Sequence, residues 1–113
     1  MPFKVGLAQK RKKLIAEELK RVIPKIVELD VEKIIVFGSS VSNTVHKSSD
    51  LDILIIKKTS KKFLDRLDEF YQHLKPSLAM DIFVYTPEEF EDMKRKNQFI
   101  KSALKNGEVV HEK

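Results

Sequence analysis

Residues 50–56 form a short run of leucine and isoleucine that is interrupted by a second aspartate, Asp52, two positions after Asp50. Such a run predicts a buried strand, and side chains two positions apart on a strand lie on the same face. Ionised carboxylates in apolar surroundings are costly unless a positive charge compensates them. The sequence therefore predicts a strand that presents Asp50 and Asp52 together to a cation.

A third aspartate, Asp81, interrupts another apolar run at residues 79–85. If the two predicted strands are neighbours, its carboxylate joins the same cluster. Magnesium prefers hard oxygen ligands and is commonly held by a few carboxylates together with substrate phosphates. Three converging acids suit a site with two Mg²⁺ ions, and Asp81 is alternatively a general base for the attacking hydroxyl.

The residues Gly38-Ser39 directly follow a β-branched run at residues 33–37, which also predicts a strand. Glycine lets a phosphate approach the backbone closely, and Ser39 and Ser40 offer hydroxyl and amide donors. A Gly-Ser pair or an Asp-x-Asp pair alone is most often a turn or a strand end. Their fixed order and spacing with Asp81 make the combination far more specific, and predict a nucleoside triphosphate site.

Hydrophobic periodicity predicts the remaining elements. A helix is expected at residues 9–29, kinked or divided by Pro24, after a loose lead-in at residues 1–9. A second helix is expected at residues 61–74. Thr86 and Pro87 open a third helix that, alone or with a successor, reaches about Lys105, and Asn106-Gly107 stops it. A short strand at Val109 and Val110 closes the chain.

These elements predict an α/β (α+β) fold in which helices cover a small mixed sheet of three to four strands. The 113 residues suffice for one domain, assigned to residues 1–113.

The charge balance and the absent residue types limit the functional classes. The net charge is +5, which favours polyanionic ligands, and part of it comes from the run at residues 10–13. Nucleic-acid binding ranks last, because the basic runs lack interleaved aromatic residues for stacking. The chain has no cysteine, which excludes disulfides and thiolate metal sites. No apolar run is long enough for a membrane span and no secretory signal is visible, so a cytoplasmic protein is expected.

The pattern of Gly38-Ser39, ten intervening residues, Asp50-Leu51-Asp52 and a later strand-borne Asp81 resembles the DNA polymerase beta-like nucleotidyltransferase superfamily. Within that superfamily it is similar to the minimal nucleotidyltransferases. The stretches Tyr85-Thr86-Pro87-Glu88-Glu89-Phe90 and Gly107-Glu108-Val109-Val110 are also similar to the C-terminal part of these proteins. The resemblance covers nearly the whole chain.

The resemblance implies a magnesium-dependent enzyme that moves a nucleoside monophosphate, with AMP from ATP as the expected case, to a hydroxyl acceptor. It further implies a partner with a HEPN domain that acts as a toxin, with this chain as the antitoxin that modifies it. The sequence departs from the family pattern after Ser39, because residues 40–45 contain no arginine to meet the triphosphate. That departure supports an alternative: a binding module with this fold that neutralises its partner by docking.

Overall fold

The computed structural model describes the backbone of residues 2–37 and 51–113, with side chains from residue 10 onward. Its elements follow in the order α1 (Pro2–Val27), β1 (Lys33–Phe37), β2 (Leu51–Ile56), α3 (Phe63–Leu74), β3 (Met80–Tyr85), α4 (Pro87–Lys96), α5 (Gln98–Asn106) and β4 (Glu108–Glu112). The strands form one sheet in the order β3-β2-β1-β4. β1 is antiparallel to both β2 and β4, whereas β2 and β3 are parallel. The predicted mixed sheet of three to four strands covered by helices is confirmed.

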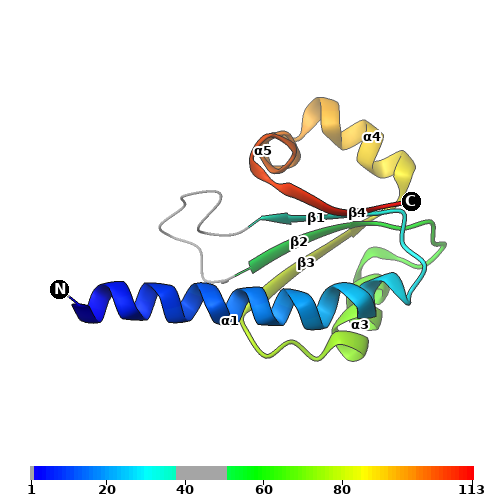
Figure 1. Cartoon of the computed structure of the whole chain (residues 1–113). Coiled ribbons are helices and arrows are strands. Elements are labelled where there is room, and N and C mark those ends of the chain that lie inside the picture. Colours follow the sequence, from blue (N-terminus) through cyan, green and yellow to red (C-terminus); the bar gives the residue numbers. More distant parts are fainter. Residues whose placement is uncertain (1, 38–50) are drawn as a thin grey trace.

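Helices cover the sheet on both faces, with α1 and α3 on one side and α4 and α5 on the other (Figure 1). Alternation along the strands divides the apolar residues between the two layers. Ile53 and Ile55 of β2 belong to the core that contains Val22 of α1 and Phe70 of α3. The other core lies under α4 and α5, and its buried members are Ile35, Phe37, Leu54, Ile56, Phe90, Ile100 and Ala103.

The first helix differs from the sequence-based expectation at its start, and of the two effects expected of Pro24 it does not show division. The expected lead-in at residues 1–9 is wrong, because α1 begins at Pro2. Proline is favoured in the first turn of a helix, where its missing N–H would have no intrahelical acceptor. Pro24 does not divide α1, which continues to Val27. Val22 and Ile26 on either side of Pro24 are completely buried, and this burial offsets the lost hydrogen bond.

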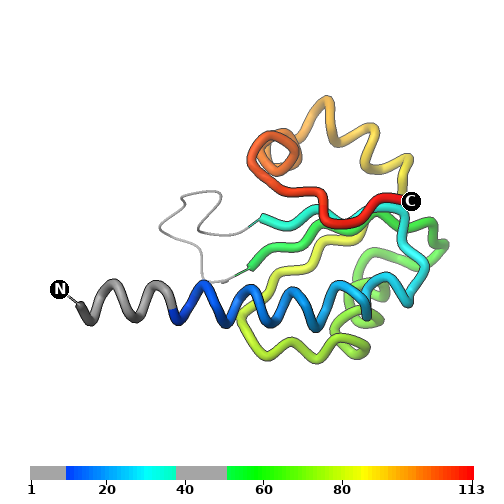
Figure 2. The backbone as a smooth tube through the Cα atoms, viewed as in Figure 1, coloured from blue at the N-terminus to red at the C-terminus, as the bar shows by residue number. Residues whose placement is uncertain are grey.

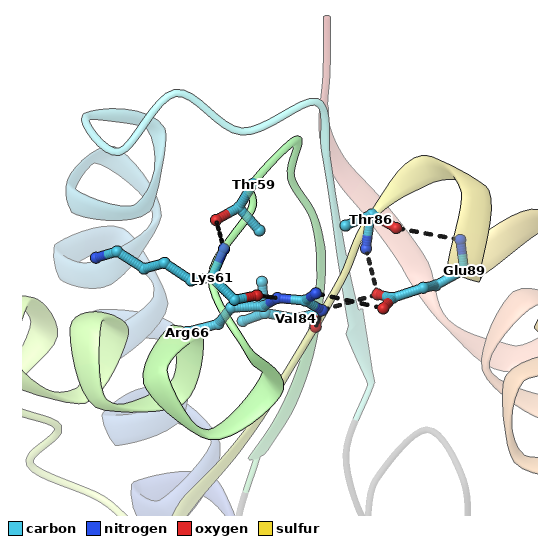
Figure 3. Close-up of polar contacts among 6 residues, drawn as sticks. All are labelled: Thr59, Lys61, Arg66, Val84, Thr86 and Glu89. Carbon is cyan, nitrogen blue, oxygen red and sulfur yellow. Dashed lines mark hydrogen bonds and ion pairs between the residues drawn. The ribbon is translucent and has the colours of Figure 1, made fainter.

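The C-terminal helical region is two helices, and both begin at a side-chain cap. The Thr86 hydroxyl accepts a hydrogen bond from the Glu89 amide, while the Glu89 carboxylate accepts one from the Thr86 amide, which confirms the predicted capping box (Figure 3). Asn97 separates α4 from α5, and its side chain accepts from the Ile100 amide at 3.1 Å. Gly107 ends α5 as predicted. A Cβ atom there would lie only 2.8 Å from Ile35 Cγ2.

The edge strand β3 is tied to α3 by a buried arginine. Arg66 is only 7% exposed, although it is charged, because it lies four residues before Phe70 on the apolar side of α3. Its guanidinium donates to the Val84 carbonyl at 3.1 Å and to both carboxylate oxygens of Glu89, at 2.7 and 3.3 Å (Figure 3). Arg66 therefore joins α3, β3 and the start of α4, and its guanidinium lowers the pKa of the Glu89 carboxyl.

A second buried charge joins α1 to the end of α3. The Glu18 carboxylate, 4% exposed, accepts two hydrogen bonds from Arg21 at 2.8 and 3.0 Å and one from the Ser77 amide at 2.6 Å. Arg21 in turn donates to the Leu74 and Lys75 carbonyls. The bonds from Arg21 are the largest cause that lowers the pKa of Glu18 from 4.5 to about 2.

This lowered pKa predicts a loss of stability in acid. Because the pKa of Glu18 in the folded chain lies below the ordinary value of 4.5, its contribution is complete above pH 4.5 and is lost as the pH falls toward 2. Solvent around Arg21 screens the pair, so we expect Glu18 to contribute about 1–2 kcal/mol to the free energy of unfolding at neutral pH. Urea unfolding at pH 6 and at pH 3 measures how much of this contribution is lost in acid. Over this interval the wild-type chain should lose more stability than Glu18→Gln by somewhat over half of this amount, because pH 3 still lies above the folded pKa, and equal losses would contradict the assignment.

Candidate functional site

The predicted site residues divide into two that the structure describes and four that it does not. Asp52 on β2 and Asp81 on β3 are described. Gly38, Ser39, Ser40 and Asp50 lie in residues 38–50, outside the described residues. The roles predicted for those four stay predictions. The described ends of β1 and β2 that flank this segment lie side by side (Figure 2), because Phe37 is the register partner of Asp52.

Asp52 and Asp81 are brought together by the parallel pairing of β2 with β3. The two residues are register partners, although 28 other residues separate them along the chain. Register partners on neighbouring strands are about 5 Å apart and point to the same side of the sheet. The expectation that the two strands are neighbours is therefore confirmed, whereas the cluster of three acids stays a prediction because Asp50 is outside the described residues.

The strand alternation also defines the face on which the acids lie. Leu54 and Phe83 follow Asp52 and Asp81 by two positions, and both belong to the core under α4 and α5. The acids therefore lie on that face, at the end of the sheet where β2 and β3 begin. Asp52 is 1% exposed, whereas Asp81 is exposed to solvent. The two neighbouring acids therefore differ in exposure: one is buried and the other is accessible to solvent.

An aromatic cluster borders the two acids on the same face. Phe99 of α5 packs edge-on against Phe37, with ring centres 5.4 Å apart, and against Phe83 at 5.0 Å. Phe37 is the register partner of Asp52, and Phe83 is two residues beyond Asp81. The three rings therefore form an apolar cluster on the face of the sheet that carries the two acids. Sequence reasoning missed Phe99, because nothing local to α5 shows that it packs over these strands.

Tyr71 of α3 is a second residue whose role the sequence did not reveal. Its hydroxyl donates to the Met80 carbonyl at 2.8 Å and accepts from the Ile82 amide at 3.1 Å. Burial raises the pKa of Tyr71, and the nearby carboxylates of Asp81 and Asp52 raise it further. In the sequence Tyr71 is one of several apolar-side positions of a helix, so only its hydroxyl hinted at a polar contact.

The donor set at this site suits a hard divalent cation. Two carboxylates on neighbouring strands repel one another, and a cation that contacts both relieves this repulsion. Oxygen ligands of this kind are those that Mg²⁺ prefers. Within the described residues no group of three or more acidic or histidine side chains could hold a metal ion. The predicted third ligand, Asp50, is outside that part of the chain.

Two concave surfaces lie away from the acids. A hollow of about 600 Å³ follows the acidic side of α3, at Asp65, Asp68 and Glu69. Another of about 470 Å³ lies between Lys33, Lys58 and Phe90, at the end of the sheet opposite Asp52 and Asp81. Their lysines and acids pair with one another at the surface, for example Lys61 with Glu69 at 3.0 Å. Neither hollow is lined by Asp52 or Asp81. No helix in the described part of the chain is both long enough and apolar enough to cross a membrane.

Comparison with models of known protein families gives one match for this chain. The model that describes the nucleotidyltransferase domain matches residues 15–110. The chain belongs to this nucleotidyltransferase family, and its general activity is nucleotidyl transfer. Comparisons with curated proteins and with solved structures found no match. The matched residues include Asp52, Asp81 and all four strands, apart from the last residues of β4.

Proposed function

We propose that this chain is a magnesium-dependent adenylyltransferase that moves AMP from ATP to a hydroxyl group. The single observation that carries the proposal is the register pairing of Asp52 with Asp81 on one face of the sheet, in a chain of the nucleotidyltransferase family. The two acids are distant along the chain but lie side by side in the sheet, which supports a cation that is bound by both carboxylates. The sequence adds Asp50, two positions before Asp52, as the third ligand.

Each residue has a defined task in this proposal. Asp52 and Asp81, with Asp50, hold Mg²⁺, which when bound neutralises charge on the triphosphate and on the leaving pyrophosphate. Gly38, Ser39 and Ser40 bind the phosphates through backbone amides and hydroxyls. Burial of Asp52 keeps its carboxylate in one position, so little reorganisation is needed when the substrate arrives.

The reaction balances without any further reagent. The acceptor oxygen forms a bond to the α-phosphorus of ATP, and the bond from that phosphorus to the oxygen bridging to the β-phosphate breaks. Pyrophosphate leaves with that oxygen, and the hydroxyl proton passes to solvent. Asp81 is exposed to solvent, which supports access of the acceptor from its side of the sheet.

We further propose that the acceptor is a hydroxyl on a HEPN-type toxin, and that the chain acts as its antitoxin. The support is the resemblance to minimal nucleotidyltransferases over nearly the whole length. A binding module that neutralises the partner by docking alone is the second candidate, favoured by the absence of arginine from residues 40–45. The two candidates differ in whether the partner becomes covalently modified.

The experiment combines the purified chain with ATP labelled at the α-phosphate, Mg²⁺ and a co-purified HEPN-domain partner. The expected result is label on the partner, release of pyrophosphate, and loss of both on addition of EDTA. Mass spectrometry of the partner should show the added mass of AMP on one hydroxyl residue. A stable complex without label or pyrophosphate would establish the docking module instead, and transfer that persists in EDTA would contradict the metal assignment.

A further inference from the structure

The outer edge of β3 is closed by side chains of α3 instead of by another strand. β3 lies at one end of the sheet order and pairs with β2. An edge strand has a row of backbone groups that face away from the sheet and need partners. The Tyr71 hydroxyl satisfies two of them, the Met80 carbonyl and the Ile82 amide. Arg66 satisfies another, the Val84 carbonyl.

The two groups that Tyr71 holds are those on either side of Asp81. Alternation directs the backbone groups of Asp81 toward β2, while those of Met80 and Ile82 face α3. One hydroxyl therefore anchors both neighbours of the acid, as a donor on one side and an acceptor on the other. Asp81 is itself exposed, so its backbone position depends on these two bonds and on the pairing with β2.

We infer that Tyr71 is a positioning residue of the metal site, which holds the β3 backbone so that the Asp81 carboxylate stays beside that of Asp52. This inference rests on the proposed function, because it assigns Tyr71 to the same Mg²⁺ site. The hydroxyl contacts no substrate and takes no part in the bond changes. Its contribution is to keep a metal ligand on an edge strand in register, where the strand would otherwise have freedom to shift.

The test is Mn²⁺ binding, measured from the electron paramagnetic resonance signal of the free ion without nucleotide. Tyr71→Phe removes one oxygen and keeps the ring, so packing against the core is retained. We expect its Kd for Mn²⁺ to rise about tenfold. This is the lower end of the loss in affinity that follows when a hydrogen bond supporting a metal ligand is removed. The matched control is Tyr85→Phe, the same change at the last residue of β3, whose ring packs on Phe63. Its Kd should equal that of the wild type.

The possible outcomes distinguish the role of Tyr71 from the existence of the metal site. Equal Kd values for wild type, Tyr71→Phe and Tyr85→Phe would overturn the role of Tyr71 and leave the metal site standing. Failure of the wild type to bind Mn²⁺, or equal binding by Asp52→Asn, would overturn the metal site itself. Circular dichroism at the titration temperature shows whether each variant is folded, so a general loss of structure is recognised.

A measurement on the wild-type chain covers the case in which Tyr71→Phe does not fold. A cation held by Asp81 restrains the β3 backbone, so hydrogen exchange of the Ile82 amide should slow about fivefold on saturation with Mg²⁺. The Ile100 amide, which caps α5, serves as the internal reference and should be unchanged. Unchanged exchange at Ile82 with bound Mg²⁺ would overturn the inference.

Discussion

Replacement of Asp52 by asparagine should reduce nucleotidyl transfer about a thousandfold. A bound metal contributes several kcal/mol of charge stabilisation to a transition state, and a loss of about 4 kcal/mol corresponds to this factor. The amide has the shape of the carboxylate but lacks the negative charge that holds Mg²⁺. Label transfer from ATP measures the rate, and Mn²⁺ titration measures the loss of affinity in the same preparation.

The fold should survive this change, because asparagine has nearly the size and shape of the buried aspartate and needs no repacking of its neighbours. The control is Asp92→Asn on α4, where the acid pairs with Lys96 at 3.1 Å on the surface. Its transfer rate should equal that of the wild type. Activity in Asp52→Asn within tenfold of wild type would contradict the site.

The companion variant Asp81→Asn distinguishes the two roles open to the second acid. As a metal ligand, Asp81 should lose both Mn²⁺ affinity and transfer when it is replaced. If transfer is lost while the Kd for Mn²⁺ is unchanged, Asp81 is instead the general base that takes the hydroxyl proton, and the pH dependence of the rate should then change as well.

Arg66→Ala should lower the free energy of unfolding by about 3 kcal/mol. The guanidinium is nearly buried and bonds to the Val84 and Lys61 carbonyls and to Glu89. Its removal leaves the buried Val84 carbonyl without its donor, the half-exposed Glu89 carboxylate without its ionic partner, and a cavity where the side chain was. Because these bonds join α3, β3 and α4, unfolding should remain cooperative while its midpoint in urea falls.

The matched control is Arg95→Ala on α4, which makes the same substitution at an exposed arginine. Arg95 pairs with Asp92 at 3.7 Å and its side chain is 76% exposed, so the expected loss is below about 0.5 kcal/mol. Similar losses for the two variants would show that the Arg66 contacts contribute no more than a surface pair. Mn²⁺ affinity of folded Arg66→Ala should stay within twofold of wild type, because its bond to β3 lies three residues beyond Asp81.

Local patterns in the sequence predicted most of the fold. The β-branched runs, the capping box at Thr86 and the stop at Gly107 all depend on neighbours within a few residues, and all were confirmed. At Pro24, distant packing overrides local preference. Pro24 lies between residues that are fully buried against the sheet, and α1 continues through it undivided. The expected kink or division reflected only the missing hydrogen bond.

The sequence by itself determined that Asp52 and Asp81 lie within apolar strands, because the pattern of a strand and the cost of burying a charge in it depend only on neighbouring residues. It could not determine the partner of each acid, since the register of Asp52 with Asp81 is set by strand pairing over a long separation. Nor could it show that Tyr71 and Arg66 close the edge of β3, because only docking of α3 brings their polar atoms to that backbone. Tertiary structure decided these contacts because satisfying the buried polar groups of an edge strand depends on what lies beside it in space.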